Sequence, residues 1–316
     1  MKKYLVLLIT LGVLPEPGFC VIPAIVAEKA GEIVVEQTVK HLVQYSDNLA
    51  GVCIQNQCGF VDHEGKVIIP FHFREVNHFN DGYAPVRLVK KWGLVDAHGR
   101  FVINPLYEGM GEYSEGFLLA CQDGQWGFID RQNKKLLDFQ FSGARSFSKG
   151  LAAVQEGGRW GYLDKKGIMR LNPVYAAAGD FSAGLAPVKI GKAWGFINKQ
   201  GEVKIPAQFD QALSFSEDLA AVQDDGQWGF INKEGRFVIN PKFDGAGPFS
   251  EKLAAVLKGG KWGYVDMKGR IAITPVFDQA DVFSEGLALV RKGDRQMFID
   301  TKGKEKSLRL KNLQNK

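Results

Sequence analysis

The tryptophans of this chain recur at a fixed spacing. The chain has six, consecutive ones are 34 residues apart, and each is followed by a glycine. The same step places Cys58 and Gln296 in this column at its two ends, and a second aromatic column runs with the same period from Tyr45 to Phe283. Such a period indicates a tandem-repeat architecture, here of eight units that fill residues 45–316. The tryptophans are Trp92, Trp126, Trp160, Trp194, Trp228 and Trp262.

The pattern within one unit predicts strands. A 34-residue period also occurs in helical tetratricopeptide repeats, but turn signals interrupt each unit too often for helices. In unit six, residues 215–248, we expect strands over 219–222, 228–232 and 237–239, the last ended by Pro241. Asp225-Gly226 is a two-residue hairpin signal. Each unit is therefore predicted to be a three-stranded antiparallel sheet.

Strand parity assigns apolar side chains to both faces of that sheet. A two-residue turn at 225–226 places Trp228 opposite Gln223 and Phe230 opposite Ala221. Gly229, without a side chain, permits close approach of another backbone segment. Because a lone sheet cannot hide two apolar faces from water, neighbouring units must sandwich each one. The fold class predicted is all-β, a solenoid-like curved array of these units; a closed β-propeller is the alternative.

The two end units depart most from the pattern, as capping repeats do. Residues 31–35 lie one period before a third strand and would complete unit eight if the ring closed. The rival interpretation is a short amphipathic helix over residues 24–44 that caps an open array. We favour the open array.

Composition supports a folded repeat protein and excludes several other classes. Glycine is abundant, and 27 of the 37 glycines fall in four columns of the repeat. The formal net charge of +5 is uneven, since residues 301–316 alone contribute six Lys/Arg and one Glu. The remaining body is nearly neutral, which argues against a nucleic-acid surface.

The first residues have the order of a secretory signal peptide. Lys2 and Lys3 precede an apolar run over residues 4–14, which is too short to span a bilayer. We predict a signal peptide over 1–20, with cleavage after Cys20 or, alternatively, after Ala27. Lipidation of Cys20 is disfavoured by the bulky Phe19 before it. The other segments are an N-terminal cap over 21–44, repeats over 45–302 and a basic tail over 303–316, with no transmembrane span in the mature chain.

The unit resembles the WG (KWG) repeat of bacterial proteins. The shared pattern is F-S-x-G-L-A-x-V…(K/Q)-W-G-F-I-D-x-x-G-x-x-V-I-x-P-x-F-D, and it covers residues 45–300. The resemblance implies a β-rich repeat array in a secreted or envelope-associated bacterial protein, and it implies no reaction. Units one, three and eight depart from it; in unit three Asn133 replaces the turn glycine and Phe139 the proline.

No catalytic motif is present, and we predict neither an enzyme, nor a cofactor, nor a metal site. An Asp or Asn begins the second turn of each unit, where its side chain accepts from backbone N–H groups. The tryptophan column is assigned to the core between units, although a ladder of aromatic rings also stacks sugars or cations. Cys53 and Cys58 fall opposite each other in one hairpin, so an oxidising compartment would allow a disulfide. Cys121 is predicted to be unpaired.

These observations favour a non-enzymatic scaffold that binds a protein or a glycan of the cell envelope. The alternative is an enzyme such as an envelope glycan hydrolase, for which the irregular unit three is the place to search. A weak contact of the basic tail with anionic surfaces is a further hypothesis. The predicted contact residues vary between units and share one hairpin position: Arg87, Gln155, Lys189, Gln223 and Arg291.

Overall fold

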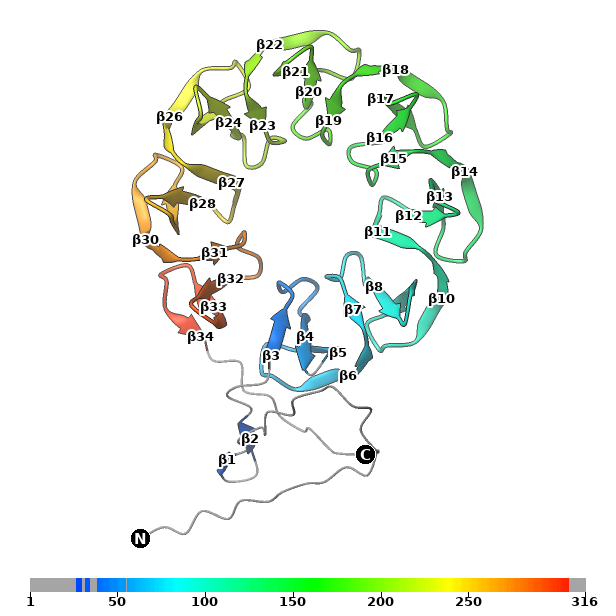
Figure 1. Cartoon of the computed structure of the whole chain (residues 1–316), viewed down its shortest axis with the longest axis vertical. Helices are drawn as coiled ribbons and strands as arrows, with labels where there is room; N and C mark the ends of the chain where they lie inside the picture. The colour runs from blue at the N-terminus through cyan, green and yellow to red at the C-terminus, as the bar shows by residue number, and fades with distance from the viewer. Residues whose placement is uncertain (1–26, 30–31, 35–38, 55, 307–316) are drawn as a thin grey trace, which may run out of the picture.

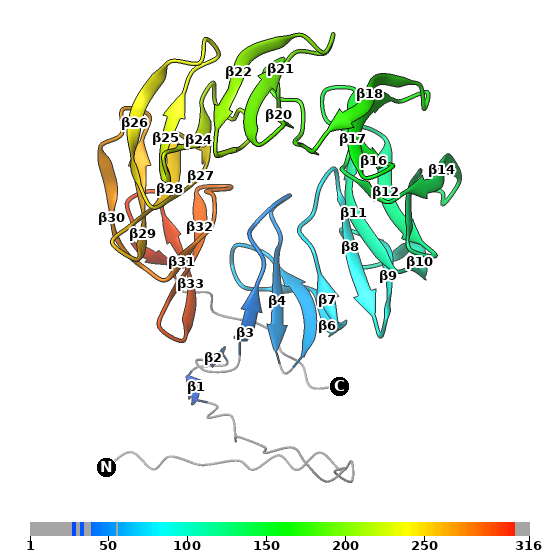
Figure 2. The same ribbon diagram turned by 45° about the horizontal axis from the view of Figure 1, so that its top comes forward.

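The chain forms a closed ring of eight blades. The computed structural model describes residues 27–29, 32–34, 39–54 and 56–306. Eight four-stranded antiparallel sheets stand around a central axis, each with its first strand innermost and its last strand at the rim (Figures 1 and 2). The predicted solenoid-like open array is therefore wrong, and the chain is an eight-bladed β-propeller. Among the described residues, no helix is long and apolar enough to cross a bilayer.

Blades 1 to 8 follow chain order, and each contains four consecutive strands. The inner strands are β3 (Val39–Leu42), β7 (Glu75–Val76), β11 (Gly109–Ser114), β15 (Gly143–Ala144), β19 (Ala177–Ala178), β23 (Gln211–Ala212), β27 (Gly245–Ser250) and β31 (Gln279–Ala280). The second strands are β4 (Ala50–Ile54), β8 (Tyr83–Leu88), β12 (Phe117–Gln122), β16 (Leu151–Glu156), β20 (Ala186–Ile190), β24 (Ala220–Asp224), β28 (Leu253–Lys258) and β32 (Leu287–Lys292). The third strands are β5 (Gln57–Val61), β9 (Lys91–Asp96), β13 (Gln125–Ile129), β17 (Arg159–Asp164), β21 (Ala193–Ile197), β25 (Gln227–Ile231), β29 (Lys261–Asp266) and β33 (Arg295–Asp300). The outer strands are β6 (Val67–Phe73), β10 (Phe101–Tyr107), β14 (Lys135–Phe141), β18 (Met169–Tyr175), β22 (Val203–Phe209), β26 (Phe237–Phe243), β30 (Ile271–Phe277) and β34 (Glu305–Lys306).

The sheets have four strands rather than the predicted three because each blade begins earlier than the aromatic column. Five of the inner strands are only two residues long, which is too short to carry an alternating pattern. Units counted from Tyr45 cut each blade between its inner and second strands. The inner strand is therefore the element that the sequence pattern did not predict.

The hairpin between the second and third strands has the predicted register. In blade 6, Gln223 pairs with Trp228 and Ala221 with Phe230. Asp225 and Gly226 between them have φ values of 48° and 75°. Both angles lie in the left-handed region that a type I′ turn requires, so the turn and its register are confirmed.

The outer strand explains the glycine after each tryptophan. The outer strand continues through Pro241 to Phe243, so the predicted end at this proline is wrong. An outer strand tolerates proline because no further strand needs its missing N–H. The same strand bends across the third strand, and a Cβ on Gly229 would lie 2.6 Å from the carbonyl oxygen of Ile239. The predicted close backbone approach at Gly229 is confirmed.

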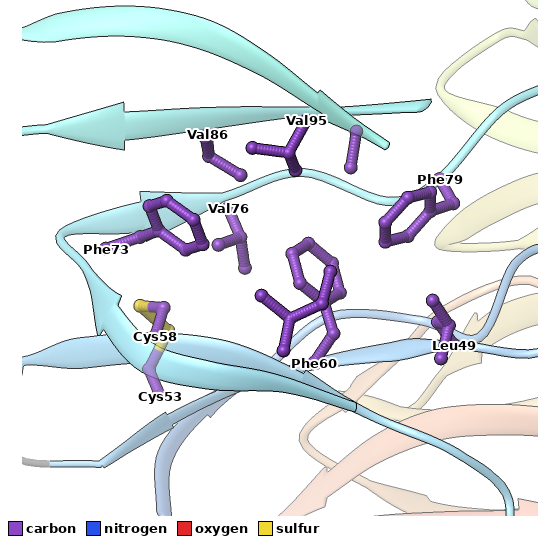
Figure 3. Packing of buried hydrophobic residues seen from close by; sticks show 11 residues of the cluster. Leu49, Cys53, Cys58, Phe60, Phe73, Val76, Phe79, Val86 and Val95 are labelled. Carbon is purple, nitrogen blue, oxygen red and sulfur yellow. A yellow bond between two sulfur atoms is a disulfide. The ribbon is translucent and has the colours of Figure 1, made fainter. Parts of the chain in front are cut away.

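The core lies between blades. Between blades 6 and 7, Phe230 and Ile239 of one sheet pack against Val256 and Val265 of the next. Figure 3 shows the same arrangement between blades 1 and 2, where Phe60 lies between the sheets. Each sheet therefore buries both apolar faces, as its sequence requires, and the blades stabilise one another.

The ring closes because blades 8 and 1 repeat the contacts made by other neighbours. Phe298 and Tyr45 have ring centroids 4.8 Å apart, the separation that Phe230 and Phe249 show between blades 6 and 7. A carboxylate oxygen of Glu285 accepts a hydrogen bond of 2.9 Å from the backbone N–H of Asn48. That bond is the counterpart of those that the backbone N–H groups of Lys252, Gly286 and Gly150 donate to Glu217, Glu251 and Glu115, respectively.

The predictions for the chain ends are corrected accordingly. Units one and eight are not caps, since they pack against each other. The expected helix over 24–44 is absent among the described residues, which form strands over 27–29, 32–34 and 39–42. β2 (Glu32–Val34) pairs with β1 (Ala27–Lys29) and not with blade 8. The predicted signal peptide, Cys20 and most of the basic tail lie outside the described residues.

Candidate binding face

Every blade directs the hairpin between its second and third strands to the same end of the ring. We call this end the hairpin face; the turns after the inner and third strands form the opposite end, the turn face. The chain also passes from each outer strand to the next inner strand at the hairpin face. There Asp210 accepts a hydrogen bond from the hairpin N–H of Gly226, as Asp278 does from Gly293. These bonds fix the hairpins relative to the sheets.

The five predicted contact residues lie in one row of the hairpin face, each opposite the tryptophan column. The pairs are Arg87 with Trp92, Gln155 with Trp160, Lys189 with Trp194, Gln223 with Trp228 and Arg291 with Gln296. All five side chains are half-buried. Because they belong to five different blades, they do not converge on one site; they form an interrupted ring around the face.

The six tryptophans are half-buried at the hairpin ends of the interfaces between blades. Trp160 packs against the cluster that blades 4 and 5 share, and Trp228 against the cluster of blades 6 and 7. A Cβ on Gly143 would lie 3.2 Å from the ring of Trp160. The indole thus covers the inner strand of its own blade as well as the interface.

Blade 1 carries two cysteines where blades 2, 4, 5 and 6 carry a polar residue and a tryptophan. Cys53 and Cys58 pair across the hairpin and are joined by a disulfide (Figure 3). Cys121 is free and buried, and burial raises the pKa of its thiol. Its thiolate is therefore disfavoured, and with it the nucleophilic form of this cysteine.

A hollow of about 600 Å³ opens beside the disulfide, between blades 1 and 2. Its polar lining residues are Asn56, Arg74, Glu75, Asn77 and Arg87, and its other lining residues include the disulfide, Val89 and Trp92. Of the predicted contact residues, only Arg87 lines it. The sequence pattern did not predict this hollow, although Cys58 stands where six other units have tryptophan and therefore places a much smaller side chain at this point.

Two smaller hollows lie beside the irregular blade 3. Their volumes are about 240 and 360 Å³, and the first is lined by one carboxylate, Asp138, and the second by Asp123. Glycoside hydrolysis ordinarily requires two facing carboxyl groups. Neither hollow brings such a pair together.

Ion pairs join the inner segments of neighbouring blades beside the central opening. His78 Nε2 lies 2.9 Å from Glu112 Oε1, and the guanidinium of Arg145 bonds both oxygens of Asp180 at 2.7 and 2.8 Å. The hydrogen bond to Glu112 raises the pKa of His78, and the same bond lowers the pKa of Glu112. These charges satisfy one another across the interfaces.

The aspartates of the second turns act within the turns, as their position predicts. The side chain of Asp96 accepts from the backbone N–H groups of His98 and Arg100 at 2.9 and 3.0 Å. Arg100 also donates its guanidinium to the second carboxylate oxygen. Among the described residues, no cluster of three His, Cys, Asp or Glu side chains is arranged to hold a metal ion.

Comparison with known proteins identifies the repeat and the fold. The family described as WG containing repeat matches residues 59–92, 92–126, 126–160, 160–192, 194–228, 228–262 and 262–295. No curated protein matches the sequence. A solved eukaryotic initiation factor is similar at 9% identity with a TM-score of 0.58, over 89% of this chain and 90% of the other. Hsv2p of Kluyveromyces lactis is similar at 10% identity with a TM-score of 0.50, over 70% and 91%. At these identities the likeness concerns the fold alone.

Proposed function

Because this chain belongs to the family of WG-repeat proteins, we propose that it is a non-enzymatic scaffold that binds a protein or glycan partner on its hairpin face. The observation that carries the proposal is the row of five half-buried polar side chains, Arg87 to Arg291, on one face of a ring. The repeat leaves this position variable while it keeps the buried columns constant. Variation on a fixed scaffold is how repeat proteins adapt a surface to a partner.

The bonding of the hairpin face supports a preformed surface. The hairpins are held by side-chain bonds such as that from Gly226 to Asp210, and the blades beneath them share buried clusters. A surface ordered before binding loses less conformational entropy when a partner docks. The single carboxylates of the hollows in blade 3 favour binding over glycan hydrolysis.

We assign the protein to the bacterial cell envelope or the secreted fraction. The N-terminal sequence has the order of a signal peptide. The Cys53–Cys58 disulfide is a bond that persists in oxidising compartments. Both features agree with a role outside the cytoplasm.

Affinity capture tests the proposal. The mature protein is immobilised and exposed to an envelope extract, beside a variant in which all five row residues are replaced by alanine. The matched control replaces one column of the turn face with the same count of amides and cations: Gln132, Lys166, Gln200, Lys268 and Lys302. We expect the row variant to lose the captured partner and the control to keep it. Equal loss from both variants, or turnover of envelope glycans by the mature protein, would contradict the proposal.

A further inference from the structure

The interface between blades 1 and 2 departs from the repeat at several positions that meet in one place. The tryptophan column has Cys58, and Arg74 stands in a column whose other members are acidic in four blades (Glu108, Asp210, Asp244 and Asp278) and uncharged in two (Ser142 and Ala176); we call it the acidic column. The hairpin of blade 2, residues 89–90, contains no glycine. The other blades serve as internal controls for what the fold needs, so these departures are not required by the fold.

The missing indole explains the hollow. Between blades 6 and 7, Trp228 occupies the hairpin end of the interface and packs on the cluster below. Between blades 1 and 2 the corresponding residue is Cys58, which is drawn back into the disulfide with Cys53. The volume of about 600 Å³ that remains open is in the range of small-molecule sites.

The lining of the hollow carries a positive charge at the position where blades 6, 7 and 8 carry a negative one. Where Asp244 accepts from the hairpin N–H of Gly259, Arg74 instead contributes a guanidinium that has no ion-pair partner among the described residues. Val89 adopts a φ of 53°, in the left-handed region, and is 74% exposed at the rim. A β-branched residue in this conformation is strained, and its exposure offers an apolar contact at the mouth.

Arg87 adds a second cation at the wall. It pairs with Glu75 and lies over the ring of Trp92 with its Cζ 6.0 Å from the centroid. Its Nε has no hydrogen-bond partner within the described part of the chain. Two arginines against one glutamate leave the lining with a net positive charge, and the amides of Asn56 and Asn77 add donors and acceptors.

We propose that this hollow binds an acidic sugar of the uronic-acid class, an inference that rests on the proposed function and specifies its glycan partner. The guanidinium of Arg74 recognises the carboxylate by paired N–H donors. The amides of Asn56 and Asn77 and the carboxylate of Glu75 bond hydroxyl groups, which both donate and accept. Val89 and the edge of Trp92 cover the apolar face of the ring.

Calorimetry with a galacturonate trimer tests the site, and the trimer's methyl ester provides a neutral ligand of the same shape. We expect the ester to bind at least about 10-fold more weakly, because a hydrogen-bonded charge contributes about 1.5–3 kcal/mol. Arg74→Asp, which restores the residue of the acidic column, has the same expected effect. The double variant Cys53→Gln/Cys58→Trp, which restores the consensus pair and fills the hollow, abolishes binding.

Controls separate the site from the fold and from the general function. Both variants introduce residues that other blades carry at these positions, so each is expected to fold; scanning calorimetry checks this, because the double variant also loses the disulfide. Lys192→Asp makes the same charge change on the exposed hairpin of blade 5 and leaves binding unchanged. Absent binding of the trimer, equal binding of its ester, or binding that survives the filled hollow overturns the proposal; preference for an acidic peptide overturns the sugar assignment. Partner capture that persists in the filled variant leaves the scaffold function standing without this site.

Discussion

The interface between blades 6 and 7 is crossed by the chain and filled by an indole. The interface between blades 8 and 1, which we call the seam, has neither the chain crossing nor the indole. At the regular interface Asp244 continues the chain from β26 into β27, and Trp228 closes the hairpin end. At the seam the tryptophan column has Gln296, whose Oε1 accepts from the backbone N–H of Leu42 at 3.0 Å.

Side-chain hydrogen bonds to backbone groups therefore join blades 8 and 1, which the chain does not connect directly. The amide of Gln44 donates to the carbonyl of Leu287 at 2.6 Å and accepts from the N–H of Leu289 at 2.8 Å. The aromatic contact and the bond from Asn48 to Glu285 match the regular interfaces. The difference teaches that the seam keeps the packing of the repeat and adds hydrogen bonds that fix its register.

The variants with the largest expected effect test whether blades 8 and 1 are packed as tightly as the other neighbouring blades. Phe298 and Phe230 are 2% and 0% exposed, on equivalent positions at the seam and between blades 6 and 7. Truncation of either to alanine leaves a cavity, so each variant should lose about 3–5 kcal/mol of unfolding free energy in urea denaturation. In an open array Phe298 would face solvent, and a loss below about 1 kcal/mol for Phe298→Ala alone would show that the seam is open in solution.

The second prediction concerns the residue that the seam lacks. Trp160→Ala removes a half-buried indole from the interface of blades 4 and 5, and we expect a loss of about 2–3 kcal/mol because only part of the side chain leaves an apolar contact. Scanning calorimetry should show a clearly lower melting temperature. Gln296→Ala, which removes one hydrogen bond at the seam, should have a smaller effect. An unchanged melting temperature for Trp160→Ala, together with lost partner binding, would reassign the column from core to ligand site.

The third prediction concerns the two bonds of Gln44, which no other interface repeats within the described part of the chain. Gln44→Ala leaves the backbone groups of Leu287 and Leu289 without this partner, with an expected loss of about 1–2 kcal/mol. Ser214→Ala, which removes one bond of 2.9 Å to the carbonyl of Asp180 within the ring, should lose less. Urea denaturation of the two variants measures the difference, and equal losses would mean that the amide adds nothing specific to closure.

The smallest expected effect depends on pH. The pKa of His78 is raised above its usual value of about 6.5 by Glu112. The protonated imidazole therefore stabilises the fold fully below that value, and the contribution disappears as the pH rises through the raised pKa. The difference in stability between the natural protein and His78→Gln should be below about 1 kcal/mol, as for exposed pairs, and larger at pH 6 than at pH 9. A difference that grows with pH would contradict the pairing with Glu112.

Features set by neighbours along the chain were predictable. The register of Gln223 with Trp228 follows from the turn at 225–226, because a two-residue hairpin fixes the pairing of its strands. The hollow between blades 1 and 2 was not found, since it requires Cys58 of one blade and Arg74 of the next to be placed across an interface. In the sequence, the only indications of the hollow are Cys58 in the tryptophan column and Arg74 in the column that includes Asp210.

By itself the sequence determined the all-β repeat, its family, its hairpins and the need of each sheet to be covered on both faces. These properties follow from a fixed period and from local turn chemistry. Only the tertiary structure decided that an inner strand completes each blade and that eight blades close a ring. Closure depends on a small rotation from each blade to the next, set by side chains such as Phe230 and Val256 that meet across the interfaces. That rotation accumulates until Phe298 meets Tyr45, and no single repeat contains it.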